Sequence, residues 1–270
     1  NVLVLGGTGK TGRRIIERLQ ARGVPCRSGS RSAEPAFDWE NPATWPAALD
    51  GMPTIYIAYQ PDLAVPGAVE TIRQFVELAV DGGARRLVLL SGRGEPEAEQ
   101  CERIVREAGA EWTILRASWF FQNFSEHFLL DSVRSDTVYL PAGAIPEPFI
   151  DADDIADVAV AALTEDGHAG QVYELSGPRL LTFGEAVAEI AAASGRQIGY
   201  VQVPIADYVA ALEAEQLPAD MIWLVNYLFT TVLDGRNASL ADGVRRALGR
   251  QPRDFAAYVS ETAASGVWHG

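Results

Sequence analysis

Short apolar runs alternate with amphipathic stretches along the chain. Continuous apolar runs are typical of buried parallel strands, whereas apolar residues spaced three and four apart are typical of helices. The runs predict strands at residues 2–5, 26–32 (with the loop that follows), 54–59, 86–90, 112–116, 172–175 and 200–204. The amphipathic stretches predict helices at residues 68–81, 95–107, 155–163, 182–193, 205–216, 221–234 and 253–264, besides a first helix that carries Ile15, Ile16 and Leu19 on one face.

A glycine-rich loop separates the first strand from the first helix. It reads Gly6-Gly7-Thr8-Gly9-Lys10-Thr11-Gly12. Side chains at these glycines would block the tight turn and the approach of backbone N–H groups to a diphosphate, which the helix N-terminus also attracts. Strand, loop and helix in this order predict a dinucleotide site, and an ordinary strand-to-helix turn is the alternative. A P-loop for nucleoside triphosphates is poorly supported, because it needs a glycine where Val4 stands.

The alternation of strands and helices predicts an α/β fold. We expect a Rossmann-type doubly wound parallel sheet with a smaller, mostly helical C-terminal substrate lobe. Residues 1–125 should form the dinucleotide-binding core. Residues 126–270 should supply the remaining core strands and helices and the substrate lobe, interleaved in one compact unit.

Composition excludes several classes of partner and site. The net charge of −14, with no basic run, argues against binding to nucleic acid. Two cysteines and three scattered histidines give neither a disulfide framework nor a metal motif. No apolar segment reaches the ~18 residues of a membrane span, and no signal peptide is visible. We expect a cytoplasmic protein without metal that acts on a small molecule, with a homodimer as one possibility.

The loop after the second strand indicates which cofactor is bound. NAD enzymes usually place an acid there for the ribose 2′-OH, whereas NADP enzymes place arginine and hydroxyl groups for the 2′-phosphate. Residues 25–33 contain no acid. They do contain the side chains of the second type, which are Arg27, Ser30, Arg31 and Ser32. We therefore predict NADPH or NADP, with solvated surface arginines as the alternative, and place Asp38 near the adenine.

Two polar residues end predicted strands at the edge where open α/β sheets bind ligands. Tyr59 ends the strand at 54–59, and Ser91 follows the strand at 86–90. Ser91 is placed to donate a hydrogen bond to a substrate carbonyl or imine near the nicotinamide. Tyr59 either lines the cofactor or substrate site or packs at its strand end.

The order of several motifs resembles the NmrA-like group of atypical short-chain dehydrogenase/reductases. The motifs are residues 6–12, Leu89-Leu90-Ser91-Gly92, Trp112-Thr113-Ile114-Leu115-Arg116, Trp119-Phe120-Phe121-Gln122-Asn123-Phe124 and residues 148–156. Within the group the chain looks closest to small NADPH-dependent reductases similar to ergot-alkaloid iminium reductases and NADPH:quinone reductases. The resemblance implies that the diphosphate is held by Gly6, Thr8, Gly9, Lys10, Thr11 and Gly12. It also implies that Arg31 and Ser32 hold the 2′-phosphate and that Ser91 and Asn123 lie near the nicotinamide.

The chain departs from ordinary short-chain dehydrogenases in one respect. Those enzymes use a Tyr-x-x-x-Lys pair, in which lysine lowers the tyrosine pKa for proton exchange with the substrate. The single lysine here is Lys10, inside the glycine loop, so the pair is absent. Iminium reduction needs hydride alone, and a quinone or an activated alkene can take its proton from solvent, with Ser91, Tyr59 or His127 as local donors. A simple ketone or alcohol fits least well.

Aromatic residues recur in the segments that follow the core. Residues 221–229 are apolar on too many sides for a helix with one narrow buried face, so they either wall a pocket, contact a second subunit or form the centre of the lobe. We place the substrate pocket at Trp119, Phe120, Phe121, His127, Trp223 and Tyr227. Asp151, Asp153 and Asp154 are interpreted as the cap of the following helix, whose dipole they complement, rather than as a metal or acid–base cluster.

These patterns favour an NADPH-dependent reductase. Hydride would pass to an apolar or aromatic molecule with an iminium, an activated C=C or a quinone-type acceptor, with Ser91, Asn123 and Tyr59 as candidate catalytic residues. A non-catalytic NADP-binding sensor or regulator is the first alternative, because the catalytic pair is missing. A redox-neutral isomerase or cyclase on the same fold is the second.

Overall fold

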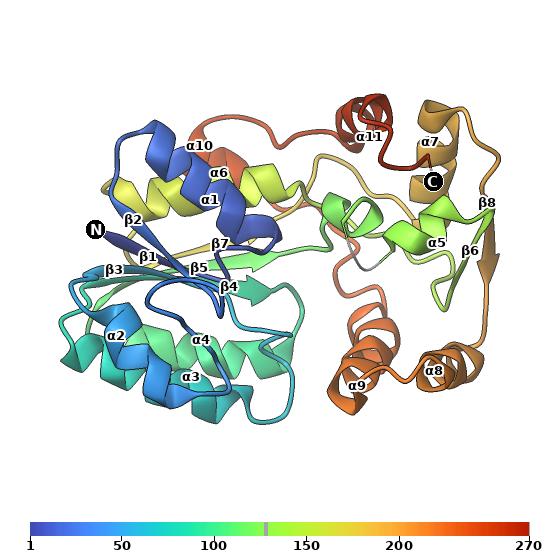
Figure 1. Ribbon diagram of the computed structural model, residues 1–270. Coiled ribbons are helices and arrows are strands. Elements are labelled where there is room, and N and C mark those ends of the chain that lie inside the picture. The colour runs from blue at the N-terminus through green and yellow to red at the C-terminus, as the bar shows by residue number, and fades with distance from the viewer. Residues whose placement is uncertain (127–128, 270) are drawn as a thin grey trace. The chain divides into compact units, whose positions relative to one another are not determined.

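The computed structural model describes residues 1–126 and 129–269 (Figure 1). The chain forms two compact units, each assembled from three stretches. The first unit comprises Asn1–Ala117, Ala152–Leu175 and Asp242–Arg250. The second unit comprises the described residues of Ser118–Asp151, Ser176–Ala241 and Gln251–Gly270. The chain therefore passes from one unit to the other five times.

A parallel sheet of six strands forms the centre of the first unit. The strands are β1 (Val2–Leu5), β2 (Cys26–Gly29), β3 (Thr54–Ile57), β4 (Arg86–Gly92), β5 (Glu111–Ala117) and β7 (Gln171–Leu175). Their order across the sheet is β2-β1-β3-β4-β5-β7, and all five neighbouring pairs are parallel. The order reverses direction at β1 and β3, as in doubly wound sheets. The predicted Rossmann-type fold is confirmed.

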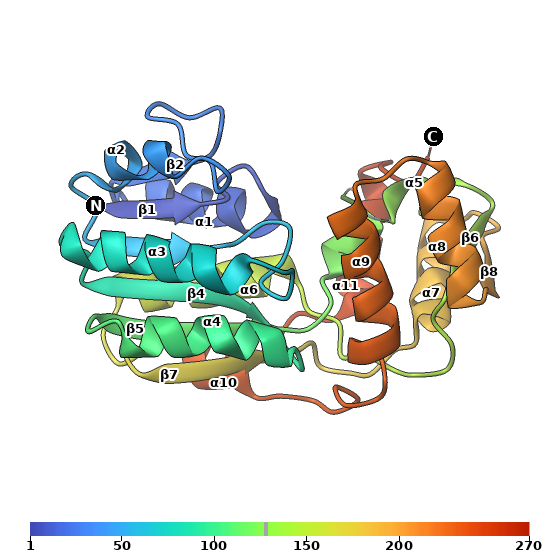
Figure 2. The same ribbon diagram turned by 90° about the horizontal axis from the view of Figure 1, so that it is seen from below.

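Helices cover both faces of this sheet (Figure 1). They are α1 (Lys10–Ala21), α2 (Trp45–Leu49), α3 (Ala68–Asp81), α4 (Pro96–Glu107), α6 (Ala152–Thr164) and α10 (Gly243–Leu248). Figure 1 shows α1, α6 and α10 on one face and α2, α3 and α4 on the other, and Figure 2 shows the length of α3 and α4 from below. Fully buried apolar strand residues such as Leu3, Ile55 and Leu87 pack beneath α3 and α4.

The second unit has its own small sheet and helices. Strands β6 (Thr137–Leu140) and β8 (Gly199–Gln202) pair in parallel. The helices are α5 (Leu130–Arg134), α7 (Phe183–Ser194), α8 (Ile205–Ala214), α9 (Ala219–Tyr227) and α11 (Phe255–Ala264). Buried aromatic rings form the core, and Phe149 packs edge-on against Phe183 with 5.0 Å between ring centroids. Helix α7 begins with the capping box of Thr182 and Glu185, as the sequence indicates.

Several elements differ from the prediction. No helix was predicted in the proline-containing stretch at 38–50, yet it holds a 3-10 turn (Pro42–Thr44) and helix α2, because Trp45 is buried against Phe37 and Phe75. The helix expected at 221–234 ends at Tyr227 and continues as a π-helical turn (Leu228–Val232). No helix among residues 1–126 and 129–269 has the length and apolar character needed to cross a membrane.

Candidate dinucleotide and substrate sites

Backbone contacts in the glycine loop leave no space for a side chain at Gly12. The Gly6 N–H donates to the Gly29 carbonyl at 2.9 Å, and the Gly9 N–H donates to the Gly6 carbonyl at 2.8 Å. Gly6 has a φ of +65°, which favours glycine. A Cβ atom at Gly12 would overlap the Gly6 carbonyl oxygen, so helix α1 approaches the loop this closely only with glycine there.

Helix α1 leaves its first backbone donors available for an anion. Its N-cap residue, Gly9, provides no side-chain cap, and the first turn contains no acid. Among the described residues, no acceptor lies on the backbone N–H of Thr11 or Gly12. The Thr11 hydroxyl accepts from Tyr56 Oη at 3.0 Å, which fixes its side chain on the strand side. Free N–H groups, a helix dipole and a closely packed glycine-rich loop fit the diphosphate of a dinucleotide.

Arg27 and Arg31, which the sequence analysis grouped together, have different surroundings in the structure. The Arg27 guanidinium donates to the carbonyl oxygens of Ala47, Ala48 and Asp50 at 3.2, 2.8 and 3.0 Å, so it caps the end of α2 and is not free for a phosphate. Arg31 is exposed, and no polar partner of its side chain lies among the described residues. The assignment of the 2′-phosphate to Arg31 and Ser32 stays a prediction.

Hydroxyl groups and one acid complete this loop. Ser30 Oγ lies 3.3 Å from the exposed Ser32 Oγ. Asp38 Oδ1 accepts from the Glu40 N–H at 3.1 Å, and the Asp38 carbonyl accepts from Trp45 Nε1 at 2.8 Å. These bonds fix the turn that carries Asp38, and its contact with adenine stays a prediction.

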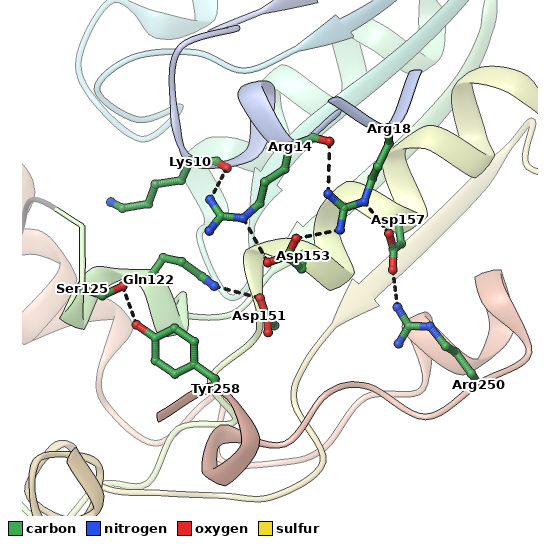
Figure 3. A network of polar contacts seen from close by, with 10 residues as sticks. All are labelled: Lys10, Arg14, Arg18, Gln122, Ser125, Asp151, Asp153, Asp157, Arg250 and Tyr258. Atoms are coloured by element: carbon green, nitrogen blue, oxygen red, sulfur yellow. Dashed lines mark hydrogen bonds and ion pairs between the residues drawn. The ribbon is translucent and has the colours of Figure 1, made fainter. Parts of the chain in front are cut away.

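An ion-pair network holds helix α1 on helix α6 (Figure 3). Arg14 Nε and Arg18 Nη2 donate to the two carboxylate oxygens of Asp153 at 3.1 and 2.6 Å. Arg18 Nε also donates to Asp157 at 2.6 Å. Arg250, which follows α10, pairs with Asp157 at 2.5 Å and with the buried Asp154 at 2.7 Å. Helix α6 begins at Ala152, earlier than the predicted 155–163, so Asp153 and Asp154 lie in its first turn, where carboxylates complement the helix dipole. The sequence did not reveal their arginine partners.

Ser91, at the end of β4, already donates its hydroxyl hydrogen. Ser91 Oγ donates to Glu102 Oε1 at 2.8 Å, and the same carboxylate accepts from Arg116 Nε and Nη2 at 2.8 and 2.7 Å. Glu102 is 1% exposed, so these bonds compensate for the burial of its charge. With this hydrogen engaged, Ser91 offers lone pairs rather than a donor. Its catalytic assignment stays a prediction.

Tyr59 lies in the loop after β3 and is half-buried. Its ring packs against Trp39 with 5.0 Å between centroids, and burial raises the pKa of its hydroxyl group. A tyrosine with a raised pKa is a weaker acid than the lysine-assisted tyrosine of ordinary short-chain dehydrogenases. Its place after a strand at the carboxyl edge leaves both the cofactor-lining and the packing interpretations open.

Two acids that the sequence analysis did not single out lie at the same edge of the sheet. Asp62 follows β3, and Glu95 follows β4. Their carboxyl groups interact through a side-chain hydrogen bond, and burial is the largest cause of a raised pKa at both. The two residues are distant in sequence, and only the pairing of β3 with β4 brings them together.

The predicted substrate residues that the structure describes lie in the second unit. Trp119 packs edge-on against Phe183 at 5.2 Å, and Phe121 is 1% exposed within the aromatic core. Phe120 and Asn123 are half-buried. Trp223 is 37% exposed and stacks flat on Tyr227, with 5.2 Å between centroids and 7° between planes. His127 lies outside the described residues.

Comparison with known proteins gives the family. Residues 6–166 match the family model described as NAD(P)H-binding. The chain belongs to this family. It is 30% identical over 285 residues to agroclavine dehydrogenase of Claviceps fusiformis, covering 99% of this chain and 98% of that one. It is 29% identical over 285 residues to NAD(P)H azoreductase of Xenophilus azovorans, covering 98% of each.

Solved structures share the fold of this family member. The NADPH complex of a quinone oxidoreductase from Escherichia coli gives a TM-score of 0.79 at 22% identity, covering 97% of this chain and 99% of that one. A double mutant of NmrA gives a TM-score of 0.70 at 16% identity, covering 98% and 95%. The NmrA-like atypical short-chain dehydrogenase/reductase assignment is confirmed, and the protein is an NAD(P)H-dependent oxidoreductase.

Proposed function

We propose that the protein is an NADPH-dependent reductase that delivers hydride to an apolar or aromatic small molecule. The acceptor carries an iminium, an activated C=C or a quinone-type group. The observation that carries the cofactor proposal is the uncapped N-terminus of α1, followed at the end of β2 by a loop with the exposed Arg31 and Ser32 and no acid at residues 25–33. When bound, the nicotinamide supplies the hydride.

The residues of the chain would bind and orient the two reactants. The backbone N–H groups of Thr11 and Gly12 are placed to hold the diphosphate, and Arg31 is placed to pair with the 2′-phosphate. In the second unit, the exposed face of Trp223 offers a flat surface for an aromatic or cationic ring.

The proposed class of acceptor depends on whether the enzyme must supply a proton during hydride transfer. The single lysine lies in the glycine loop, so the chain has no tyrosine–lysine pair to protonate a carbonyl oxygen during hydride transfer. An iminium carbon already carries the charge that protonation would create, and a quinone stabilises the anion that hydride addition leaves. The names of the relatives, a clavine dehydrogenase and an azoreductase, favour conjugated nitrogen-containing or aromatic acceptors over simple ketones.

Calorimetric titration with NADPH, NADP⁺, NADH and NAD⁺ tests the cofactor. We expect binding that is selective for the two phosphorylated nucleotides. NADPH oxidation is then followed by absorbance with menadione, an enone, an N-alkyl cyclic iminium and a simple ketone. Consumption above background with at least one of the first three, and not with the ketone, supports the proposal. Selective NADP binding with no turnover of any acceptor would instead support the sensor.

A further inference from the structure

The loops after β3 and β4 bring two carboxyl groups together at the carboxyl edge of the sheet. These strands are paired neighbours, with Ile57 opposite Leu89 near their ends. Asp62 lies five residues beyond Ile57, and Glu95 lies three residues beyond Gly92, which ends β4. Ligands of open α/β sheets bind outside this edge, so the pair lies in the region where a reactant of the enzyme is held.

Glu95 is held in place by its backbone neighbours. Its side chain is folded over Gly92, where a Cβ atom would overlap the carboxylate. The residue is 7% exposed, and Oε2 has no hydrogen-bond partner among residues 1–126 and 129–269. A buried carboxylate with an unpaired oxygen is costly when charged and much less so when protonated. This arrangement therefore favours a neutral Glu95.

Asp62 is the more accessible member of the pair. It is half-buried, and its Oδ1 accepts from the Ala64 N–H at 2.8 Å. Glu97 also acts on Glu95, and the charge of Asp62 acts on the Cys101 thiol; neither of these neighbouring groups is cationic. No arginine or lysine within the described part of the chain forms an ion pair with Asp62 or Glu95. With no cation beside them, sharing one proton costs the two carboxyl groups less than carrying two charges.

These surroundings raise the pKa values of both carboxyl groups. Burial raises the pKa of Glu95 well above its usual range, and the charge of Asp62 together with their hydrogen bond raises it further. Burial also raises the pKa of Asp62, against the hydrogen bonds that it accepts. A carboxylic acid whose pKa is raised by burial is better suited to general-acid work than an ordinary exposed one.

We propose that Asp62 donates the proton that completes reduction of a quinone, enone or azo acceptor, and that Glu95 is the positioning residue that holds and resupplies this proton. The inference rests on the proposed reductase function and supplies the acid that the missing tyrosine–lysine pair would have provided. Hydride adds to the acceptor, and the π electron pair moves to its oxygen or nitrogen. Glu95 passes the shared proton to Asp62, that atom takes it from Asp62, and the pair, left as two carboxylates, recovers one proton from solvent.

The test compares an acceptor that needs a proton with one that does not. Menadione takes hydride and a proton, whereas N-methyl-3,4-dihydroisoquinolinium takes hydride alone. We expect Asp62→Asn and Glu95→Gln to lower kcat/KM for menadione by about 100-fold, the usual contribution of a general acid, and to lower the iminium rate much less. Glu107→Gln changes an exposed acid at the last residue of α4, the helix whose N-cap is Glu95, and is the matched control.

The pH profile separates positioning from a merely structural role. The wild-type rate of menadione reduction should fall as pH rises and the acid pair loses its proton. In Glu95→Gln the pH at which the rate falls should shift. Equal losses of kcat/KM for the two acceptors, or a pH dependence that does not shift in Glu95→Gln, would overturn proton donation by the pair. Neither result would contradict the proposed reductase function. Failure of the wild type to reduce either acceptor would overturn the proposed function. NADPH titration of each variant checks that the dinucleotide site is still folded.

Discussion

Arg18 and Asp153 join the first helix of the chain to a helix more than a hundred residues later, with Nη2 2.6 Å from Oδ1. Arg14 reaches the same carboxylate, so Asp153 fixes α1, whose N-terminus forms the predicted diphosphate site. Burial alone would raise the pKa of Asp153, but hydrogen bonds from Arg18 and Arg14 lower it below its ordinary value.

Asp153→Asn should destabilise the protein. We expect a loss of about 1–2 kcal/mol at pH 7, between the values for exposed and buried ion pairs, measured by urea unfolding. Because the folded pKa of Asp153 is lowered, its contribution is present at neutral pH and is lost as pH falls through that pKa, so the difference from wild type should shrink below about pH 4. Glu165→Gln, which breaks the exposed Arg22–Glu165 pair, should cost less than about 0.5 kcal/mol. Equal losses for both variants would contradict the special position of Asp153.

Two glycine substitutions in the loop should differ in severity. Gly12→Ala places a Cβ on the Gly6 carbonyl oxygen, whereas Gly9→Ala places one 3.2 Å from the same atom. We expect Gly12→Ala to cost at least about 2 kcal/mol of stability or prevent folding, as overpacking does, and Gly9→Ala to remain folded. Thermal unfolding followed by circular dichroism measures both. A Gly12→Ala protein as stable as wild type would show that α1 does not need this close approach.

Arg31→Gln should alter the choice of cofactor. Loss of charge-assisted hydrogen bonds worth about 1.5–3 kcal/mol should weaken NADPH binding ~10- to 100-fold and leave NADH binding nearly unchanged. Arg27→Gln is the matched control, because Arg27 caps α2 through three carbonyl oxygens. That variant should lose stability but keep the ratio of NADPH to NADH affinity. The assignment of Arg31 would be wrong if the two arginine variants changed this ratio alike in calorimetry.

Trp223→Ala should weaken binding of an aromatic acceptor. The ring is 37% exposed and stacks on Tyr227, so its removal takes away a flat surface at small cost in stability. We expect KM for menadione to rise about 5- to 10-fold, the value of one aromatic stacking contact of about 1–1.5 kcal/mol. Tyr139→Ala removes a 52% exposed ring on β6 of the same unit and should leave KM unchanged. A rise of KM in both variants would point to a general effect on the second unit.

Glu95→Gln should make stability less dependent on pH. The folded pKa of Glu95 is raised, so the folded protein binds more protons than the unfolded chain between the two pKa values. Wild-type stability should therefore fall as pH rises above about 4.3, the value of an unfolded glutamate, and Glu95→Gln should lack this component. Urea unfolding from pH 4 to 8 measures the slope. Parallel curves for the two proteins would mean that Glu95 is charged when folded.

The sequence predicted a helix or strand well where a strong local pattern determines it. Helix α3 occupies Ala68–Asp81 as expected, because an apolar stripe such as Ile72 and Phe75 ends at paired glycines. Helix α2 was missed because its stability comes from burial of Trp45 against distant residues, which overrides the prolines around it. Short helices depend on such tertiary packing more than on propensity.

The glycine loop was visible in the sequence because its chemistry lies within a few consecutive residues. Partners far apart in the chain were not visible. Nothing local distinguishes Arg27, which caps a helix, from Arg31, which is exposed. The pairing of Asp62 with Glu95 depends on the neighbouring positions of β3 and β4, and sequence spacing alone does not give that order.

The five passages of the chain between the units bear on how the protein is made. Helix α10 (Gly243–Leu248) packs on β7 and α6 of the first unit, and a Cβ atom at Gly243 would overlap the Glu174 carbonyl oxygen. A ribosome must therefore synthesise almost all of the second unit before the last helix of the first emerges from its exit tunnel. The nascent nucleotide-binding half stays incomplete until then, so chaperones would meet both halves together rather than one finished domain after another.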